Sequence, residues 1–125
     1  MKLFDSSVLI AHLRGIPAAT ELLRGAVQDD EAACSVLSRV EIEGGMRSAE
    51  RAAVARLFDG MRLEPVTDLI ARRAGEHLRT HRQSHPGIDV VDYVIAATAE
   101  VHDADLLTLN VKHFPMLRGL AAAFR

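Results

Sequence analysis

Four short apolar segments alternate along this chain with longer segments of helical character, and this alternation constrains the fold most strongly. The expected strands are residues 1–4 (MKLF), 32–37 (AACSVL), 61–66 (MRLEPV) and 105–109 (DLLTL). Strands separated by helices pair in parallel, because each connection must cross back over a face of the sheet. The sequence therefore predicts an α/β fold, a three-layer α/β/α sandwich around a central, mainly parallel sheet.

The segments between the expected strands carry the apolar spacing and the terminal residues of helices. Helices are expected over residues 8–14, 18–27, 48–59, 68–82 and 90–102, and a further one is expected to open at Ser38 and break near Gly44 and Gly45. Asp89 is expected to cap the last helix through its side chain. The tail, residues 117–124, fits either an edge strand or a helix, and the sequence leaves both open.

Length and composition exclude several classes of protein. A chain of 125 residues is expected to form a single domain over 1–125 that needs no disulfide to hold its core. Cys34 is the only cysteine, which rules out an internal disulfide and a cysteine zinc site and favours a reducing, cytoplasmic location. The apolar runs fall far short of the ~20 residues that span a bilayer, so no membrane association is expected.

Three acidic residues stand where helices follow strands or loops: Asp5, Glu41 and Asp92. Each has a structural explanation beside a functional one. Asp5 could cap a helix, although the serines after it could do the same. Glu41 follows Ser38 with the S-x-x-E spacing of a capping box, and Asp92 follows Asp89 with the same spacing.

The carboxyl ends of parallel strands meet at one edge of a sheet, so Asp5, Glu41 and Asp92 are candidates for a shared site. Two unpaired carboxylates ~5 Å apart repel by about 3 kcal/mol at an effective dielectric constant of 20. A cluster of this kind is tolerated beside arginines or around a divalent cation. Oxygen ligands favour Mg²⁺ or Mn²⁺ over zinc, and such an ion supports phosphoryl chemistry.

Three stretches of the chain resemble the motifs of PIN-domain ribonucleases, in particular the VapC-type toxins of bacterial toxin–antitoxin pairs. They are LFDSSVLI at the start, SVLSRVEIEGG with Glu41 four residues before Gly45, and DYVIAATAEVHDADLLTLN. The stretches occur in the family's order and extend over nearly the whole chain. The resemblance implies a PIN-like fold and an endoribonuclease toxin that depends on Mg²⁺ or Mn²⁺ and hydrolyses RNA.

The resemblance also assigns roles to individual residues. It makes Asp5, Glu41 and Asp92 the catalytic acidic cluster, with Asp5 and Asp92 as direct metal ligands and Glu41 orienting or deprotonating the attacking water. The family's fourth acidic position falls on Asn110, whose amide adds no negative charge. Ser7 matches a position beside the metal.

His113 is expected to border the substrate groove, as a supporting residue. The implied partners are the RNA substrate, a cognate antitoxin and a second copy of the chain, as a homodimer or within a toxin–antitoxin hetero-oligomer.

Other interpretations remain open at this stage. Asn110 keeps open a catalytically inactive PIN-fold module that binds RNA or protein. A phosphoacceptor receiver domain shares the α/β class, but the only two lysines, Lys2 and Lys112, do not suit it. Histidines at 77, 81 and 85 share a helical face that could bind a metal or simply be solvated. Four arginines in the same segment could contact RNA phosphates or be plain surface charges: Arg72, Arg73, Arg79 and Arg82.

Overall fold

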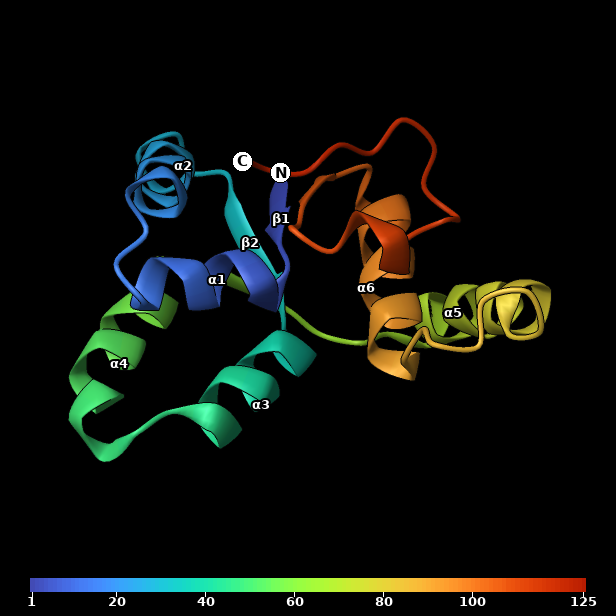
Figure 1. Ribbon diagram of the computed structural model, residues 1–125, viewed down its shortest axis with the longest axis horizontal. Helices are drawn as coiled ribbons and strands as arrows, with labels where there is room; N and C mark the ends of the chain where they lie inside the picture. The colour runs from blue at the N-terminus through green and yellow to red at the C-terminus, as the bar shows by residue number, and fades with distance from the viewer.

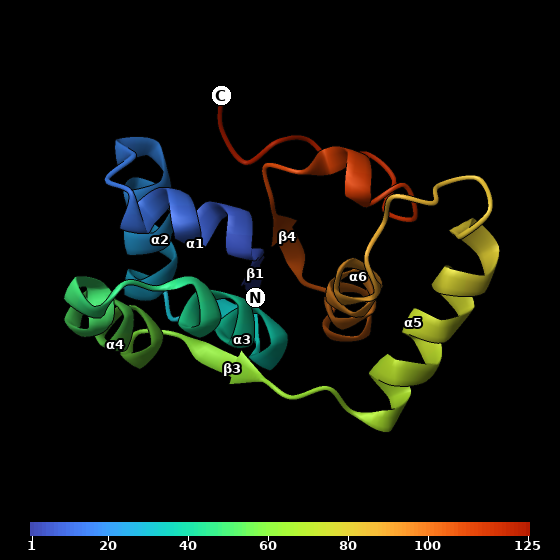
Figure 2. The same cartoon turned by 60° about the horizontal axis from the view of Figure 1, so that its bottom comes forward.

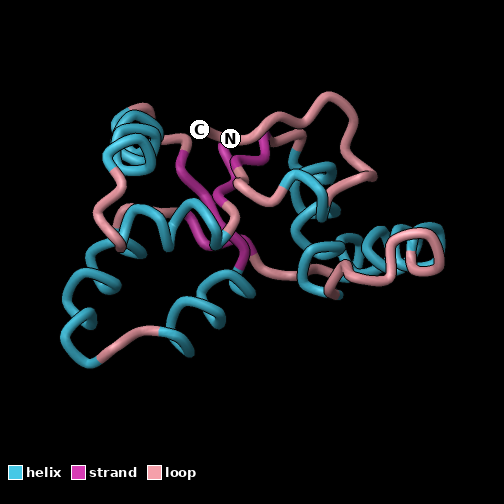
Figure 3. Tube along the Cα trace, in the orientation of Figure 1, coloured by secondary structure: helices cyan, strands magenta, loops and turns pink.

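The computed structural model describes residues 1–125 and has a central sheet of four parallel strands. The strands are β1 (Lys2–Phe4), β2 (Ala32–Ser35), β3 (Arg62–Glu64) and β4 (Asp105–Leu107), in the order β3-β2-β1-β4. Figure 3 shows them in the middle of the molecule, between two groups of helices. The predicted α/β/α class is confirmed, and the sheet is wholly rather than mainly parallel.

Six helices cover the two faces of this sheet. They are α1 (Ser6–Leu13), α2 (Pro17–Gln28), α3 (Val36–Gly45), α4 (Arg51–Asp59), α5 (Asp68–His81) and α6 (Val90–His102), with short 3₁₀ turns at Ser48–Glu50 and Val111–His113. Figure 1 shows α1 to α4 gathered on one side of the strands and α5 with α6 on the other. In Figure 2 an extended segment after β3 carries the chain across to α5. None of these helices has the length and apolar character needed to cross a membrane.

Alternation along the strands divides the core between the two faces. Phe4 and Cys34 pack with residues of α1 to α4, whereas Leu3 and Ala33 pack against α6. Successive side chains of a strand point to opposite faces, so a sheet of such short strands is buried on both sides. This burial holds the strand ends, and the residues that follow them, in fixed positions.

Two expectations about individual elements are wrong. Helix α3 begins at Val36 rather than at Ser38, because the Ser35 hydroxyl accepts the Leu37 backbone N–H at 3.1 Å and caps the helix three residues earlier. The capping box that would have explained Glu41 is therefore absent, and Glu41 lies in the interior of the helix. The end of α3 at Gly45 agrees with the predicted break.

The tail forms neither the edge strand nor the helix that the sequence allowed. Residues 114–125 run as turns and bends. Gly119 has φ +74°, a left-handed conformation that interrupts both kinds of regular structure. One backbone hydrogen bond, from Ala123 N–H to the Thr108 carbonyl at 2.9 Å, ties the tail to the end of β4.

Candidate active site

Asp5 lies at the carboxyl end of β1, where the order of the strands reverses. The chain passes from β1 to β2 and β3 on one side and returns to β4 on the other, which is the place where ligands bind in open parallel sheets. Asp5 is the residue before α1, yet its side chain makes no capping hydrogen bond. Its side chain is buried, with only 4% of the residue exposed. The capping explanation for Asp5 is therefore wrong.

Two hydroxyls hold the Asp5 carboxylate from its Oδ2 side. Ser7 Oγ donates to Oδ2 at 2.9 Å, and Thr108 Oγ1 donates to the same atom at 2.7 Å. Thr108 comes directly after β4 and is fully buried. Strand pairing of Phe4 with Leu107, and the Asp5 N–H donated to the Leu107 carbonyl at 2.9 Å, bring the two segments together.

Glu41, on α3, lies within electrostatic reach of the Asp5 carboxylate. Burial raises the pKa of Glu41, the Ser6 hydroxyl lowers it, and the charges of Asp5, Asp92 and Asp89 raise it further. The outcome is a pKa above the ordinary value for glutamate. The charged groups that act on Glu41 are all carboxylates, so the neighbouring charges disfavour its ionised form.

Asp92 completes the group from the first turn of α6. Burial raises the pKa of Asp92 most, the neighbouring His113 lowers it, and the Asp5 carboxylate raises it. His113 Nδ1 lies 3.1 Å from Asp92 Oδ2. The helix is capped by Asp89, whose Oδ1 accepts the Val91 N–H at 3.3 Å as the sequence predicted. Asp5, Glu41 and Asp92 thus converge electrostatically, each from a different element.

Asn110 lies beside this group with its side chain exposed and without a hydrogen bond. Its backbone N–H donates to Thr108 Oγ1 at 3.0 Å, so the residue is tied to the Asp5 network through its main chain. Sequence analysis did not single out Thr108, although it stands two residues before Asn110 in the quoted motif. The signal available was the T-x-N ending of that motif, in which Thr108 is the threonine.

The donor set fits a hard divalent cation. The carboxylates supply oxygen atoms and carry an excess of negative charge, and Mg²⁺ and Mn²⁺ prefer both. No three His, Cys, Asp or Glu side chains stand close enough to enclose a metal ion by themselves. Mg²⁺ usually takes one or two carboxylates and keeps several waters, so a group of three such side chains is not required for it to bind.

The histidines at 77, 81 and 85 do not form a metal site, and His85 lies beyond the end of α5 at His81. His77 is buried and contacts Glu100 of α6 through its Nε2, while the rings of His81 and His85 lie 5.7 Å apart in an edge-on arrangement. Glu100 also accepts from Arg73 at 2.9 Å. These contacts join α5 to α6, which is a structural role for His77 and Arg73.

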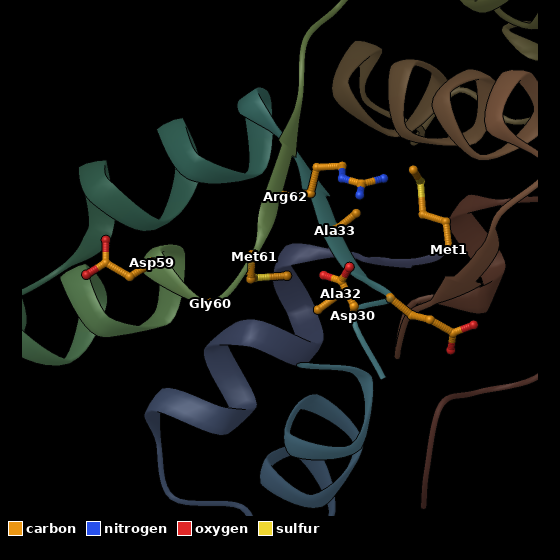
Figure 4. A pocket seen from close by; sticks show the side chains of 9 residues that line it. Met1, Asp30, Ala32, Ala33, Asp59, Gly60, Met61 and Arg62 are labelled. Carbon is orange, nitrogen blue, oxygen red and sulfur yellow. The ribbon is translucent and has the colours of Figure 1, made fainter. Parts of the chain in front are cut away.

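A cavity lies at the opposite edge of the sheet. It has a volume of about 400 Å³ and lies at the amino ends of the strands (Figure 4). Its lining includes three acidic residues and one arginine: Asp30, Glu31, Asp59 and Arg62. None of the residues predicted for the site lines this cavity.

The chain is similar to known proteins over nearly its whole length. The family model for the PIN domain matches residues 2–116. Ribonuclease VapC10 of Mycobacterium tuberculosis (strain H37Rv) is 53% identical over 124 residues, which cover 99% of this chain and 93% of that protein. Ribonuclease VapC19 of the same strain is 50% identical over 121 residues, covering 96% of this chain and 97% of that protein.

Solved structures share the fold at lower identity. A toxin–antitoxin complex from Klebsiella pneumoniae has a chain with a TM-score of 0.77 and 23% identity, covering 100% of this chain and 99% of that one. DNA-bound VapBC from Salmonella typhimurium has a TM-score of 0.80 and 16% identity, with coverage of 97% and 95%. At these identities the likeness shows the fold alone.

Proposed function

This chain belongs to the PIN-domain family, and from that premise we propose that it is an endoribonuclease toxin of the VapC type. It hydrolyses RNA phosphodiester bonds and is neutralised by a cognate antitoxin. The observation that carries the proposal is the convergence of Asp5, Glu41 and Asp92 at the switch point of the sheet. Relatives named as VapC ribonucleases, about half identical over nearly the whole chain, support the same activity.

We further propose that the reaction depends on Mg²⁺ or Mn²⁺, held by Asp5 and Asp92. The support is the pKa of Asp92, which burial raises first, which His113 lowers and which the Asp5 and Asp89 carboxylates raise; the net result is a raised pKa, so added positive charge would be favoured there. An ion of this kind, when bound, acidifies water and offsets the charge that builds up on the phosphodiester. Mg²⁺ usually takes only one or two carboxylates and keeps several waters.

The chain's own residues then have distinct tasks. Glu41, with its raised pKa, orients the attacking water and accepts its proton, because a carboxylate with a raised pKa is a better base at neutral pH. Ser7 holds the Asp5 carboxylate through Oδ2. His113 holds Asp92 from the other side, and the exposed Asn110 amide offers a hydrogen bond to the substrate side of the site.

The partner proposed for regulation is an antitoxin protein. The chains from Klebsiella pneumoniae and Salmonella typhimurium that share this fold come from toxin–antitoxin complexes, and the antitoxin is carried over from them to this chain as part of the proposal. A homodimer, or a hetero-oligomer with the antitoxin, is proposed as the assembled form.

The test is cleavage of total cellular RNA by the antitoxin-free protein with Mn²⁺ or Mg²⁺. Parallel reactions contain EDTA or the Asp5→Ala variant. We expect discrete fragments that disappear in both controls. Intact RNA in every reaction, with the protein folded and binding no Mn²⁺, would contradict the proposal and favour an inactive module that binds RNA or protein. Fragments that persist in the Asp5→Ala reaction would remove Asp5 from the site.

A further inference from the structure

Two hydroxyls converge on a single oxygen of Asp5, and one of them belongs to a residue that the proposed function has not used. We propose that Thr108 is a positioning residue for the Asp5 carboxylate. Together with Ser7 it occupies Oδ2 and leaves Oδ1 as the atom that binds the metal ion. The inference rests on the proposed function and names a residue that regulates how tightly the same site holds its ion.

The directions of the hydrogen bonds follow from what each hydroxyl already accepts. Thr108 Oγ1 accepts the Asn110 N–H at 3.0 Å, and Ser7 Oγ accepts the Leu109 N–H at 3.0 Å. A hydroxyl has one proton to donate, and an ionised carboxylate can only accept. Both protons therefore go to Asp5 Oδ2.

The 3.4 Å separation between Ser7 Oγ and Thr108 Oγ1 fits this assignment. It is longer than the usual distance between two hydroxyl oxygens that share a proton. Neither hydroxyl therefore donates its proton to the other. Two consecutive backbone N–H groups after β4, those of Leu109 and Asn110, thus reach the Asp5 carboxylate through two separate hydroxyls.

This arrangement makes the two carboxylate oxygens unequal. Oδ2 receives two donors, at 2.7 and 2.9 Å, which uses its two lone pairs in the carboxylate plane. No hydrogen bond reaches Oδ1. Partners of this kind fix the orientation of a metal ligand, and their loss typically weakens metal binding.

A second buried threonine shows what an ordinary structural hydroxyl does in this protein. Thr98 is as deeply buried as Thr108, but its Oγ1 donates to the Val94 carbonyl of its own helix at 2.7 Å. Threonine commonly makes that bond in helices. Thr98 is therefore a matched control, because its change to valine removes a buried hydroxyl without touching Asp5.

The experiment measures the dissociation constant for Mn²⁺ by isothermal titration in the purified full chain and its variants. We expect Thr108→Val to weaken Mn²⁺ binding by roughly 10- to 100-fold, the range found for partners of metal ligands. Thr108→Ser should restore most of the affinity, because it keeps the hydroxyl. Thr98→Val should leave the affinity unchanged. In RNA cleavage, Thr108→Val should need more Mn²⁺ for half-maximal rate while the KM for RNA stays the same.

Unchanged Mn²⁺ affinity in Thr108→Val would overturn the inference, and so would a Thr108→Ser variant as weak as Thr108→Val. If Thr108→Val does not fold, Ser7→Ala decides, because it removes the other donor at a partly exposed position; an unchanged affinity there overturns the inference. A wild-type protein that neither binds Mn²⁺ nor cleaves RNA would contradict the proposed function itself. A wild-type protein that does both, beside an unaffected Thr108→Val, would contradict only the role of Thr108.

Discussion

The two edges of the sheet both gather carboxylates, but they differ in the basic side chains that lie near them. At the amino edge, Asp30, Glu31 and Asp59 line the large cavity together with Arg62 (Figure 4). At the carboxyl edge, Asp5, Glu41 and Asp92 interact electrostatically, and the basic side chain beside them is His113, whose Nδ1 lies 3.1 Å from Asp92 Oδ2.

The difference shows that the volume of a cavity does not identify the candidate active site in this protein. The amino edge offers about 400 Å³ of space but none of the residues expected for catalysis. At the carboxyl edge, burial and mutual repulsion raise the pKa of Glu41 and of Asp92. Carboxylates kept in such an unfavourable place are typical of functional sites.

The largest expected effect comes from removing one acid at each edge in turn. We expect Asp92→Asn to lower the rate of RNA cleavage by about 1000-fold, because a metal ligand contributes several kcal/mol to charge stabilisation. Asp59→Asn, the matched change at the amino edge, should leave the rate within about twofold. Single-turnover cleavage rates measure both. Equal losses of cleavage rate in the two variants would contradict the assignment of the reaction to the carboxyl edge.

Glu41→Gln should lower kcat by about 100-fold, the usual contribution of a general base. The amide keeps the size of the side chain but cannot accept the proton of the attacking water. Steady-state cleavage at saturating Mn²⁺ separates this effect from loss of the ion, since Asp5 and Asp92 remain. A kcat equal to that of the wild type would remove Glu41 from the reaction.

The same variant should change how stability depends on pH. Burial, followed by neighbouring carboxylates, raises the pKa of Glu41 in the folded chain, so the folded state binds protons more readily than the unfolded state. The free energy of unfolding therefore falls as pH rises from the ordinary carboxyl pKa of about 4.3 through the raised value. Glu41→Gln should flatten that fall, as urea unfolding in metal-free buffer would measure. An unaltered slope would contradict the raised pKa.

Glu100 supplies the opposite case, an acid whose charge is balanced. Burial alone would raise the pKa of Glu100, but hydrogen bonds from Arg73 and His77 lower it below the ordinary value. Its contribution to stability is therefore present above the ordinary carboxyl pKa and is lost as pH falls through the lowered value. We expect Glu100→Gln to cost about 1–2 kcal/mol at neutral pH, because the hydrogen bonds from Arg73 and His77 then go to a neutral amide, and hydrogen bonds to charged groups are the stronger ones.

Urea unfolding across acidic and neutral pH measures that cost, and the more exposed Glu76→Gln is the control. Glu76 contacts the same Arg73 at 2.8 Å, but exposed ion pairs contribute little. If the free energy of unfolding changed with pH in the same way in Glu100→Gln as in Glu41→Gln, the contrast between the two acids would be wrong.

The smallest effect is expected at Asn110. Asn110→Asp restores a negative charge at the exposed margin of the site, and we expect it to lower the Mn²⁺ concentration for half-maximal cleavage by no more than about fivefold, the range of an exposed ion pair. A titration of cleavage rate against Mn²⁺ measures the shift. A shift in the opposite direction would place Asn110 away from the ion.

The sequence predicted the parts of this structure that depend on patterns within one segment. Apolar segments separated by helices indicated a parallel sheet, and Asp5 directly after the first of them indicated an acid at its carboxyl edge. Such features need only the alternation of strands and helices. The cap at Asp89 was predictable for the same reason, because a helix cap depends on only three or four consecutive residues.

The start of α3 and the role of Thr108 could not be read in this way. Ser35 and Ser38 are both good caps, and the choice depends on where β2 stops pairing with its neighbours, which is a property of the sheet. Thr108 meets Asp5 across 103 positions of sequence. That contact exists only once β1 and β4 have paired, so no local pattern contains it.

The central claim is that the acids at the carboxyl edge hold a divalent cation. Its most direct test is isothermal titration of Mn²⁺ into the wild-type chain, into Asp5→Asn and into Asp59→Asn at neutral pH. The account predicts binding to the wild type and to Asp59→Asn, and loss of binding in a folded Asp5→Asn. Binding that survives in Asp5→Asn, or that disappears in Asp59→Asn, would contradict it.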